Sequence, residues 1–316
     1  MSRAPLDPEQ SLAIRAAWLH YVGGLTQAAV AKRLGIASVK AHRLIARAVA
    51  EGAVKVSIDG DIVECVELET ELVARYGLDF CEVAPDLDEI GLPIRSLGMA
   101  GADFLRRQIE AAATPVIGLG HGRTLAAMVQ YLPRIEAPDL KFVSLLGGLT
   151  RNYSANPHDV MHRIAEKTGA RAYVMPVPFF ANTAEDREVL LAQRGVAEVF
   201  AMANAAGLKL VGIGTVEVDA QLVASGMIEP KEIKAIQSAG GVGELLGHFF
   251  DAEGRILQTQ LTARTLSVSF AEAGDPIVAV AGGPDKIAAI RAVLSSRRLK
   301  GLITDETTAR ALVLAK

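Results

Sequence analysis

Residues 116–125, VIGLGHGRTL, join an apolar run, a glycine-rich turn and the beginning of a helix. A short apolar run that ends in glycines and continues into helix-forming residues is typical of a buried strand that turns into a helix. Glycines let backbone N–H groups approach a ligand, and a helix N-terminus favours negative charge. The stretch predicts a strand–turn–helix unit of an α/β domain, with Arg123 and Thr124 as further donors to a phosphate or polyhydroxyl group.

The same alternation of apolar runs and helical segments continues on both sides of this unit. It indicates a mostly parallel, doubly wound sheet covered by helices on both faces, and ligands of such sheets bind at the carboxyl ends of the strands. The seven predicted strands are Phe80–Ala84, Pro115–Leu119, Phe142–Leu146, Arg171–Met175, Leu208–Ile213, Pro276–Ala281 and Gly301–Thr304.

Several other strand ends carry glycines or polar residues. Residues 145–150 (LLGGLT), 211–215 (VGIGT) and 278–286 (VAVAGGPDK) resemble the first turn, although glycines at such turns also serve packing. Lys286 would begin a helix, where a cation opposes the helix dipole. Lys286 is therefore either a ligand-binding residue or a solvated surface lysine. Glu244, in a glycine-rich segment, could accept hydrogen bonds from sugar hydroxyls.

The first 55 residues differ from the rest of the chain in charge. They hold eight Lys or Arg and three Asp or Glu, a formal charge of +5, whereas the remainder carries −8 within a total of −3. A basic head on an acidic body suggests that only the head meets a polyanion. Charge alone is weak support, because basic helical faces are often only solvated.

The head has the spacing of a helix-turn-helix. Pro8–Tyr21 predicts a first helix, and Thr26 is a suitable N-cap for a second, Gln27–Leu34. Gly35 permits the sharp turn, because glycine enters the left-handed region at little cost. Ser38 would cap a third helix that ends near Ala50. The predicted apolar face of the first helix comprises Leu12, Ile14, Ala17, Trp18 and Tyr21.

The third helix would be laid in the major groove of DNA, with its N-terminal half at the base edges. Lys40 and Arg43 could donate to guanine or phosphate, and Arg47 to phosphate. The alternative is a three-helix bundle with a solvated basic face. The predicted DNA-binding residues are Thr26, Gln27, Ser38, Val39, Lys40, His42, Arg43 and Arg47.

Between head and body, the sequence predicts a β-hairpin wing followed by a charged helix. Residues 54–58 alternate like a strand, Asp59-Gly60 signals a turn, and Ile62-Val63 returns. The expected organisation is a winged helix-turn-helix domain at 1–63, a linker helix at 64–77 and an effector-binding and oligomerisation domain at 78–316.

Other functional classes receive little support. No apolar run of membrane-spanning length occurs, and the first ten residues lack the apolar segment of a signal peptide, so we expect a cytoplasmic protein. Cys65 and Cys81 lack metal-ligand spacing and are expected to be reduced thiols. We predict no cofactor, no metal and no catalytic residues. The alternative is an isomerase- or deaminase-like sugar-phosphate enzyme, whose base would be Glu244, His121 or His248.

Taken together, these motifs resemble the SorC-type family of sugar-binding transcriptional regulators over nearly the whole chain. The head segment 26–56 is similar to the helix-turn-helix of that family. Successive motifs of its effector domain are matched by residues 118–125 (GLGHGRTL), 145–150 (LLGGLT), 241–254 (GVGELLGHFFDAEG), 279–294 (AVAGGPDKIAAIRAVL) and 301–313 (GLITDETTARALV). Within the family, residues 16–35 and 175–190 are most similar to members that control erythritol catabolism.

The resemblance implies a body similar to glucosamine-phosphate deaminases and ribose-phosphate isomerases. It also implies a homo-oligomer, dimer or tetramer, that binds double-stranded operator DNA. A sugar, polyol or phosphorylated derivative would control the regulator, which we expect to be a repressor, and erythritol is one candidate. The effector-binding residues that it implies are Gly120, His121, Gly122, Arg123, Thr124, Gly147, Gly148, Glu244 and Lys286.

Overall fold

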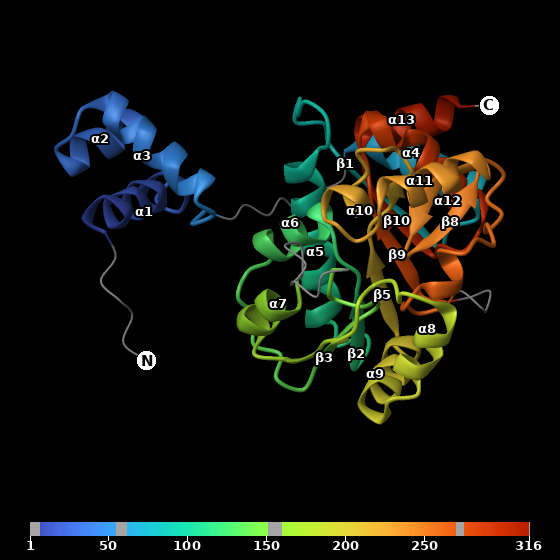
Figure 1. Cartoon of the computed structure of the whole chain (residues 1–316). Helices are drawn as coiled ribbons and strands as arrows, with labels where there is room; N and C mark the ends of the chain where they lie inside the picture. The colour runs from blue at the N-terminus through green and yellow to red at the C-terminus, as the bar shows by residue number, and fades with distance from the viewer. Residues whose placement is uncertain (1–6, 55–61, 151–159, 270–274, 316) are drawn as a thin grey trace. The chain divides into compact units, whose positions relative to one another are not determined.

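A computed structural model describes residues 7–54, 62–150, 160–269 and 275–315. The chain divides into two compact units, residues 1–59 and 60–316, here called the head and the body (Figure 1). The predicted wing hairpin falls largely on residues 55–61, outside the described part of the chain.

The head consists of the three predicted helices, α1 (Pro8–Tyr21), α2 (Gln27–Leu34) and α3 (Ser38–Ala50). The Thr26 hydroxyl caps α2 by accepting a hydrogen bond from the Ala29 N–H at 3.2 Å, as predicted. Gly35, the C-cap of α2, has φ 66°, a left-handed backbone conformation that commonly ends α-helices.

Two local predictions for the head were wrong. The N-cap of α3 is Ala37, so Ser38 is the first helical residue and makes no capping bond. The buried face of α1 is formed by Ala13, Ala16, Ala17 and Leu19, whereas Trp18 is 58% exposed. Helices α2 and α3 pack against the small alanines, because these allow a close approach of the helix axes.

The body contains all seven predicted strands in one parallel sheet. Its order is β1-β10-β9-β5-β2-β3-β4. From β2 the chain winds outward through β3 and β4, and from β5 it winds the other way through β9 and β10. The bounds are β1 Phe80–Ala84, β2 Val116–Leu119, β3 Lys141–Ser144, β4 Arg171–Tyr173, β5 Leu208–Val211, β9 Ile277–Val280 and β10 Gly301–Asp305.

Helices cover both faces of this sheet, which makes the body a doubly wound domain (Figure 1). One face is covered by α5 (Ile94–Glu110), α6 (Arg123–Tyr131) and α7 (Met161–Thr168). The opposite face carries helices from four parts of the chain: α4 (Val63–Tyr76), α9 (Arg194–Asn204), α12 (Ile287–Ser295) and α13 (Glu306–Leu314). The strand order reverses between β2 and β5, and helices cover both faces of the sheet at this switch point. In doubly wound folds, ligand-binding crevices open there at the carboxyl ends of the strands.

The helix expected as a linker, α4, packs into the body. Its residues Cys65, Leu68, Leu72 and Tyr76 are buried in the same core as β1 and α13. Residues 60–76 thus belong to the second unit. No helix in the described ranges is long and apolar enough to cross a membrane.

A small antiparallel sheet, which the sequence analysis did not predict, lies beside the carboxyl ends of the parallel strands. It consists of β6 (Gly214–Thr215), β7 (Gly241–Leu245) and β8 (His248–Asp251). Short helices complete the body: α8 (Ala184–Leu191), α10 (Gln221–Ala224), α11 (Pro230–Ser238) and 3-10 turns at Thr262–Arg264 and Pro284–Lys286.

Candidate effector cavity and DNA-binding face

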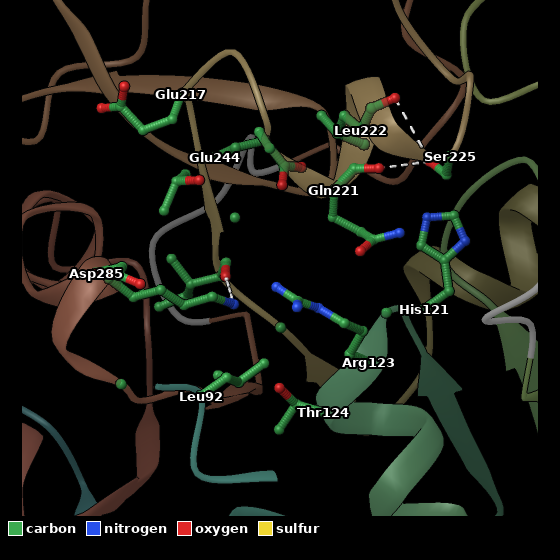
Figure 2. Close-up of a pocket in the computed structure, with 18 of the residues that line it drawn as sticks. Leu92, His121, Arg123, Thr124, Glu217, Gln221, Leu222, Ser225, Glu244 and Asp285 are labelled. Carbon is green, nitrogen blue, oxygen red and sulfur yellow. Dashed lines mark hydrogen bonds between the residues drawn. The ribbon is translucent and has the colours of Figure 1, made fainter. Parts of the chain in front are cut away.

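A cavity of about 830 Å³ opens at the carboxyl ends of β2, β5 and β9, beside the switch point of the sheet. This volume suits a small ligand together with ordered water. The walls come from the turns that follow these strands, from the β1–α5 loop and from the segment that contains α10 (Figure 2). The polar side chains on the wall are His121, Arg123, Thr124, Thr215, Glu217, Asp219, Gln221, Ser225, Glu244, Asp285 and Lys286.

The N-terminus of α6 forms one wall. Gly122 precedes the helix with φ 125°, a conformation that side-chain-bearing residues rarely adopt. Thr124, in the first turn, is only 4% exposed. The Arg123 guanidinium points into the cavity (Figure 2) and forms no ion pair with the described residues. An uncompensated cation at a helix N-terminus favours an anionic ligand.

Glu244 of β7 presents a buried carboxyl group to the cavity. The side chain is 8% exposed and accepts a hydrogen bond from the Gly247 N–H at 2.5 Å. It lies opposite Gly214 of β6, where a Cβ atom would approach its Oε2 to 2.3 Å, so a larger residue there would displace the carboxyl group. Burial raises the pKa of Glu244 to about 7, although the Gly247 N–H and the nearby Lys286 oppose the shift.

Lys286 supplies a second cation. Its ammonium group donates to the Ile213 carbonyl oxygen at 2.7 Å and so is held at the end of β5. Burial, and after it the positive charge of Arg123, lowers the pKa of Lys286 to about 8 against the opposing effect of Glu244. Arg123 and Lys286 are thus close enough to repel each other, and an anion between them would relieve that repulsion.

This arrangement is suited to binding. Two cations and a helix N-terminus can hold a phosphate or carboxylate, and a buried carboxyl group can accept from hydroxyl groups. His248 does not line the cavity, and burial lowers the pKa of His248 to about 4. No cluster of His, Cys, Asp or Glu able to hold a metal ion occurs among the described residues.

Six of the nine predicted effector residues lie together on the cavity wall. They are His121, Gly122, Arg123, Thr124, Glu244 and Lys286.

The other three glycines serve the packing of the backbone. A Cβ atom on Gly147 would lie 2.3 Å from the Pro178 carbonyl oxygen, and the Gly148 N–H donates to the Met175 carbonyl oxygen at 3.2 Å. The N–H of Gly120 donates to the Leu210 carbonyl oxygen at 2.8 Å and so ties β2 to β5.

The wall formed by residues 215–225 was not predicted from the sequence. This segment follows the third glycine-bearing strand end, but its polar residues show no periodicity that would place them on one face. Gln221 and Ser225 reach the cavity only because α10 folds back over it.

Six of the eight predicted DNA-binding residues are exposed on the head, and the other two, Gln27 and Arg47, are half-buried. Val39, Lys40, His42 and Arg43 are exposed on α3, and no ion pair ties Lys40 or Arg43 to the described residues. Gln27 of α2 bonds through its Oε1 to a ring nitrogen of His42 at 3.1 Å, which joins the two helices of the motif.

Arg47 differs from the other basic residues of α3. It forms ion pairs with Glu51 at 2.6 Å, with Glu9 at 3.0 Å and with Asp7 at 3.9 Å. The hydrogen bond and charge of Glu51, together with Glu9, raise the pKa of Arg47. Its charge is therefore partly neutralised within the head, unlike that of Arg43.

Comparison with known proteins places these features in a family. Residues 60–314 match the model of a putative sugar-binding domain. The chain is 68% identical over 308 residues to the erythritol catabolism regulatory protein EryD of Brucella abortus, covering 97% of this chain and 98% of that protein. It is 34% identical to the transcriptional regulator LsrR of an Enterobacter species, over 96% of this chain and 93% of the relative.

Solved structures agree with the fold. The full-length sorbitol operon regulator SorC of Klebsiella pneumoniae superposes with a TM-score of 0.71 at 24% identity, over 98% of this chain and all of that one. A DeoR family regulator of Listeria monocytogenes gives a TM-score of 0.70 at 21% identity, over 78% of this chain.

The named relatives are regulators of transcription, not enzymes. The family match covers the body, and the relatives cover head and body together. This chain belongs to the SorC-type family of sugar-binding transcriptional regulators.

Proposed function

We propose that this regulator represses a polyol catabolic operon and is released from its operator by a phosphorylated polyol, with erythritol phosphate as the first candidate. The observation that carries the effector class is the pair of cations, Arg123 and Lys286, at the N-terminus of α6. The erythritol assignment rests on the 68% identity to a regulator of erythritol catabolism.

The anion of the effector would lie between Arg123 and Lys286 and accept from backbone N–H groups at the beginning of α6. The Thr124 hydroxyl is buried beside that position. Glu244 would accept hydrogen bonds from hydroxyl groups of the polyol. A phosphorylated polyol carries both a charged phosphate and hydroxyl groups, so it would contact both the two cations and Glu244.

The head would bind double-stranded operator DNA through the exposed residues of α3. Lys40 and Arg43 would read guanine edges or hold phosphates, with Gln27 and His42 beside them. Thr26, Ser38, Val39 and Arg47 complete the proposed face.

We infer a homo-oligomer, dimer or tetramer, because two heads on one assembly would match the two half-sites of a palindromic operator. Effector binding would favour an arrangement with a different spacing of the heads, and operator affinity would fall by the difference in binding free energy. A protein that regulates bacterial operons would act in the cytoplasm.

The test is fluorescence anisotropy of labelled DNA from upstream of the protein's own operon, titrated with the full chain at fixed salt. Erythritol, erythritol phosphate and common sugar phosphates are added in parallel. We expect sequence-selective binding that a polyol phosphate weakens. Selective binding that responds to erythritol but to no phosphorylated compound would refute the anionic effector, and the absence of selective binding would refute the DNA-binding face.

A further inference from the structure

The wall formed by α10 is held against the body by two buried residues, and local hydrogen bonds define its backbone. Ala220, which precedes the helix, and Leu222 within it are both buried. The Ser225 hydroxyl donates to the Gln221 carbonyl oxygen at 2.7 Å, and the Met227 N–H donates to the Leu222 carbonyl oxygen at 2.9 Å. The residue between these two buried neighbours is therefore placed at the cavity wall.

That residue is Gln221, and its amide points into the cavity toward His121 and Arg123 (Figure 2). Within the described part of the chain, the amide makes no hydrogen bond, since the only bonds of Gln221 involve its backbone. An amide offers two N–H donors and one acceptor oxygen, which matches a hydroxyl group that both donates and accepts.

The charged groups of the lining favour one anionic group rather than two. Among the described residues that line the cavity, Arg123 and Lys286 are the Lys and Arg side chains, whereas the carboxyl groups come from Glu217, Asp219, Glu244 and Asp285. One anionic group can be held between the two cations, and a second would meet carboxyl groups with no further Lys or Arg to hold it. A ligand charged at both ends would fit this distribution poorly.

We propose that Gln221 is a specificity-determining residue that binds hydroxyl groups at the uncharged end of the effector, so that the cavity selects polyol monophosphates over bisphosphates. This inference rests on the proposed function, because it needs the phosphate at the α6 side. It adds the orientation of the ligand and names the group that recognises its hydroxylated end.

The test is calorimetric titration of the full chain with three probes: erythritol 4-phosphate, butyl phosphate, which has the same carbon chain without hydroxyls, and erythritol 1,4-bisphosphate. The variant is Gln221→Leu, of similar size but without hydrogen-bonding groups. The matched control is Gln130→Leu, the same change at an exposed position near the other end of α6.

We expect the wild type to bind erythritol phosphate more tightly than butyl phosphate or the bisphosphate. Gln221→Leu should lower the affinity for erythritol phosphate about tenfold, the effect of one or two hydrogen bonds, and leave that for butyl phosphate unchanged. Gln130→Leu should change neither.

Four results would overturn the inference while leaving the proposed function intact. For Gln221→Leu, these are an unchanged preference for erythritol phosphate over butyl phosphate, or an equal loss of affinity for both. For the wild type, they are a preference for the bisphosphate, or equal affinity for erythritol phosphate and butyl phosphate. A wild type that binds none of the probes contradicts the proposed function itself.

Discussion

The head and the body use charge in different ways. In the described part of the head, six of the ten buried core residues are alanine, and Lys40 and Arg43 of α3 are exposed on its surface. In the body, large aliphatic and aromatic side chains fill two layers, and the cavity charges Glu244 and Lys286 are partly desolvated, with shifted pKa values. Exposed charge suits a long polyanion, whereas desolvated charge discriminates among small ligands.

The largest effect is expected from filling the cavity. Thr124→Tyr places an aromatic ring at the N-terminus of α6, where Thr124 is 4% exposed. It should abolish the response to effector and spare basal operator affinity, because the change lies in the body. Anisotropy titrations with and without erythritol phosphate measure both quantities. A surviving response would exclude the α6 turn from the effector site.

A glycine of the body should be nearly as sensitive. Gly147→Val forces a Cβ atom against the Pro178 carbonyl oxygen, 2.3 Å away, so the backbone must move. Overpacking of this kind costs about 2 kcal/mol of stability. Calorimetric unfolding should show a lower transition temperature for the body, and an unaltered transition would contradict the packing role of Gly147.

In the head, two arginines of one helix should behave differently. Arg43→Ala should weaken operator binding about tenfold, the effect of one lost base or phosphate contact. Arg47→Ala should weaken it less, because Arg47 is already paired with Glu9 and Glu51. Circular dichroism checks that both heads remain folded. Equal losses, or a larger loss for Arg47, would reverse the assigned roles.

The smallest effect concerns pH. The pKa of Lys286 is about 8, so its ammonium group is lost as pH rises from 7 to 9, and Glu244, with a pKa of about 7, becomes fully ionised over the same range. Both changes disfavour an anion, and affinity for erythritol phosphate should fall several-fold. Glu244→Gln should remove the part of this pH dependence that lies near pH 7. An affinity that does not change with pH in either the wild type or the variant would exclude these groups from anion binding.

The same pKa values determine whether the folded state becomes more or less stable as pH rises. Glu244 has a higher pKa in the folded chain than its ordinary 4.5, so the folded state holds more protons between pH 4.5 and 7. Its contribution to stability therefore declines as pH rises through that window. Lys286 acts in the opposite direction between about 8 and 10.5, where deprotonation removes the cost of a buried charge.

Local sequence patterns were sufficient for the sheet and for the helix-turn-helix. Most of the parallel strands, such as β2, β5 and β9, are short apolar runs that lead into a glycine, and the turn at Gly35 requires a left-handed conformation that glycine supplies. The burial of α1 was not predictable in this way, because its inward face depends on where α2 and α3 pack. Trp18 is large and apolar, yet alanines occupy the crossing.

The cavity was predictable only in part. The residues at strand ends, such as Arg123 and Lys286, follow from topology, because parallel strands bring their carboxyl ends together. The small sheet β6–β8 was missed, since Gly241 and Gly243 weaken the signal for a strand. Gln221 depends on the course of a four-residue helix, which no short-range pattern determines.

The central claim, that one small ligand controls the head through the body, is tested most directly by measuring effector affinity twice. Calorimetry of erythritol phosphate is performed with the full chain alone and with the full chain saturated by operator duplex. Linkage requires that DNA weaken effector binding by the same factor by which effector weakens DNA binding. We predict a factor of at least five in both directions, and equal effector affinity with and without DNA would contradict the account.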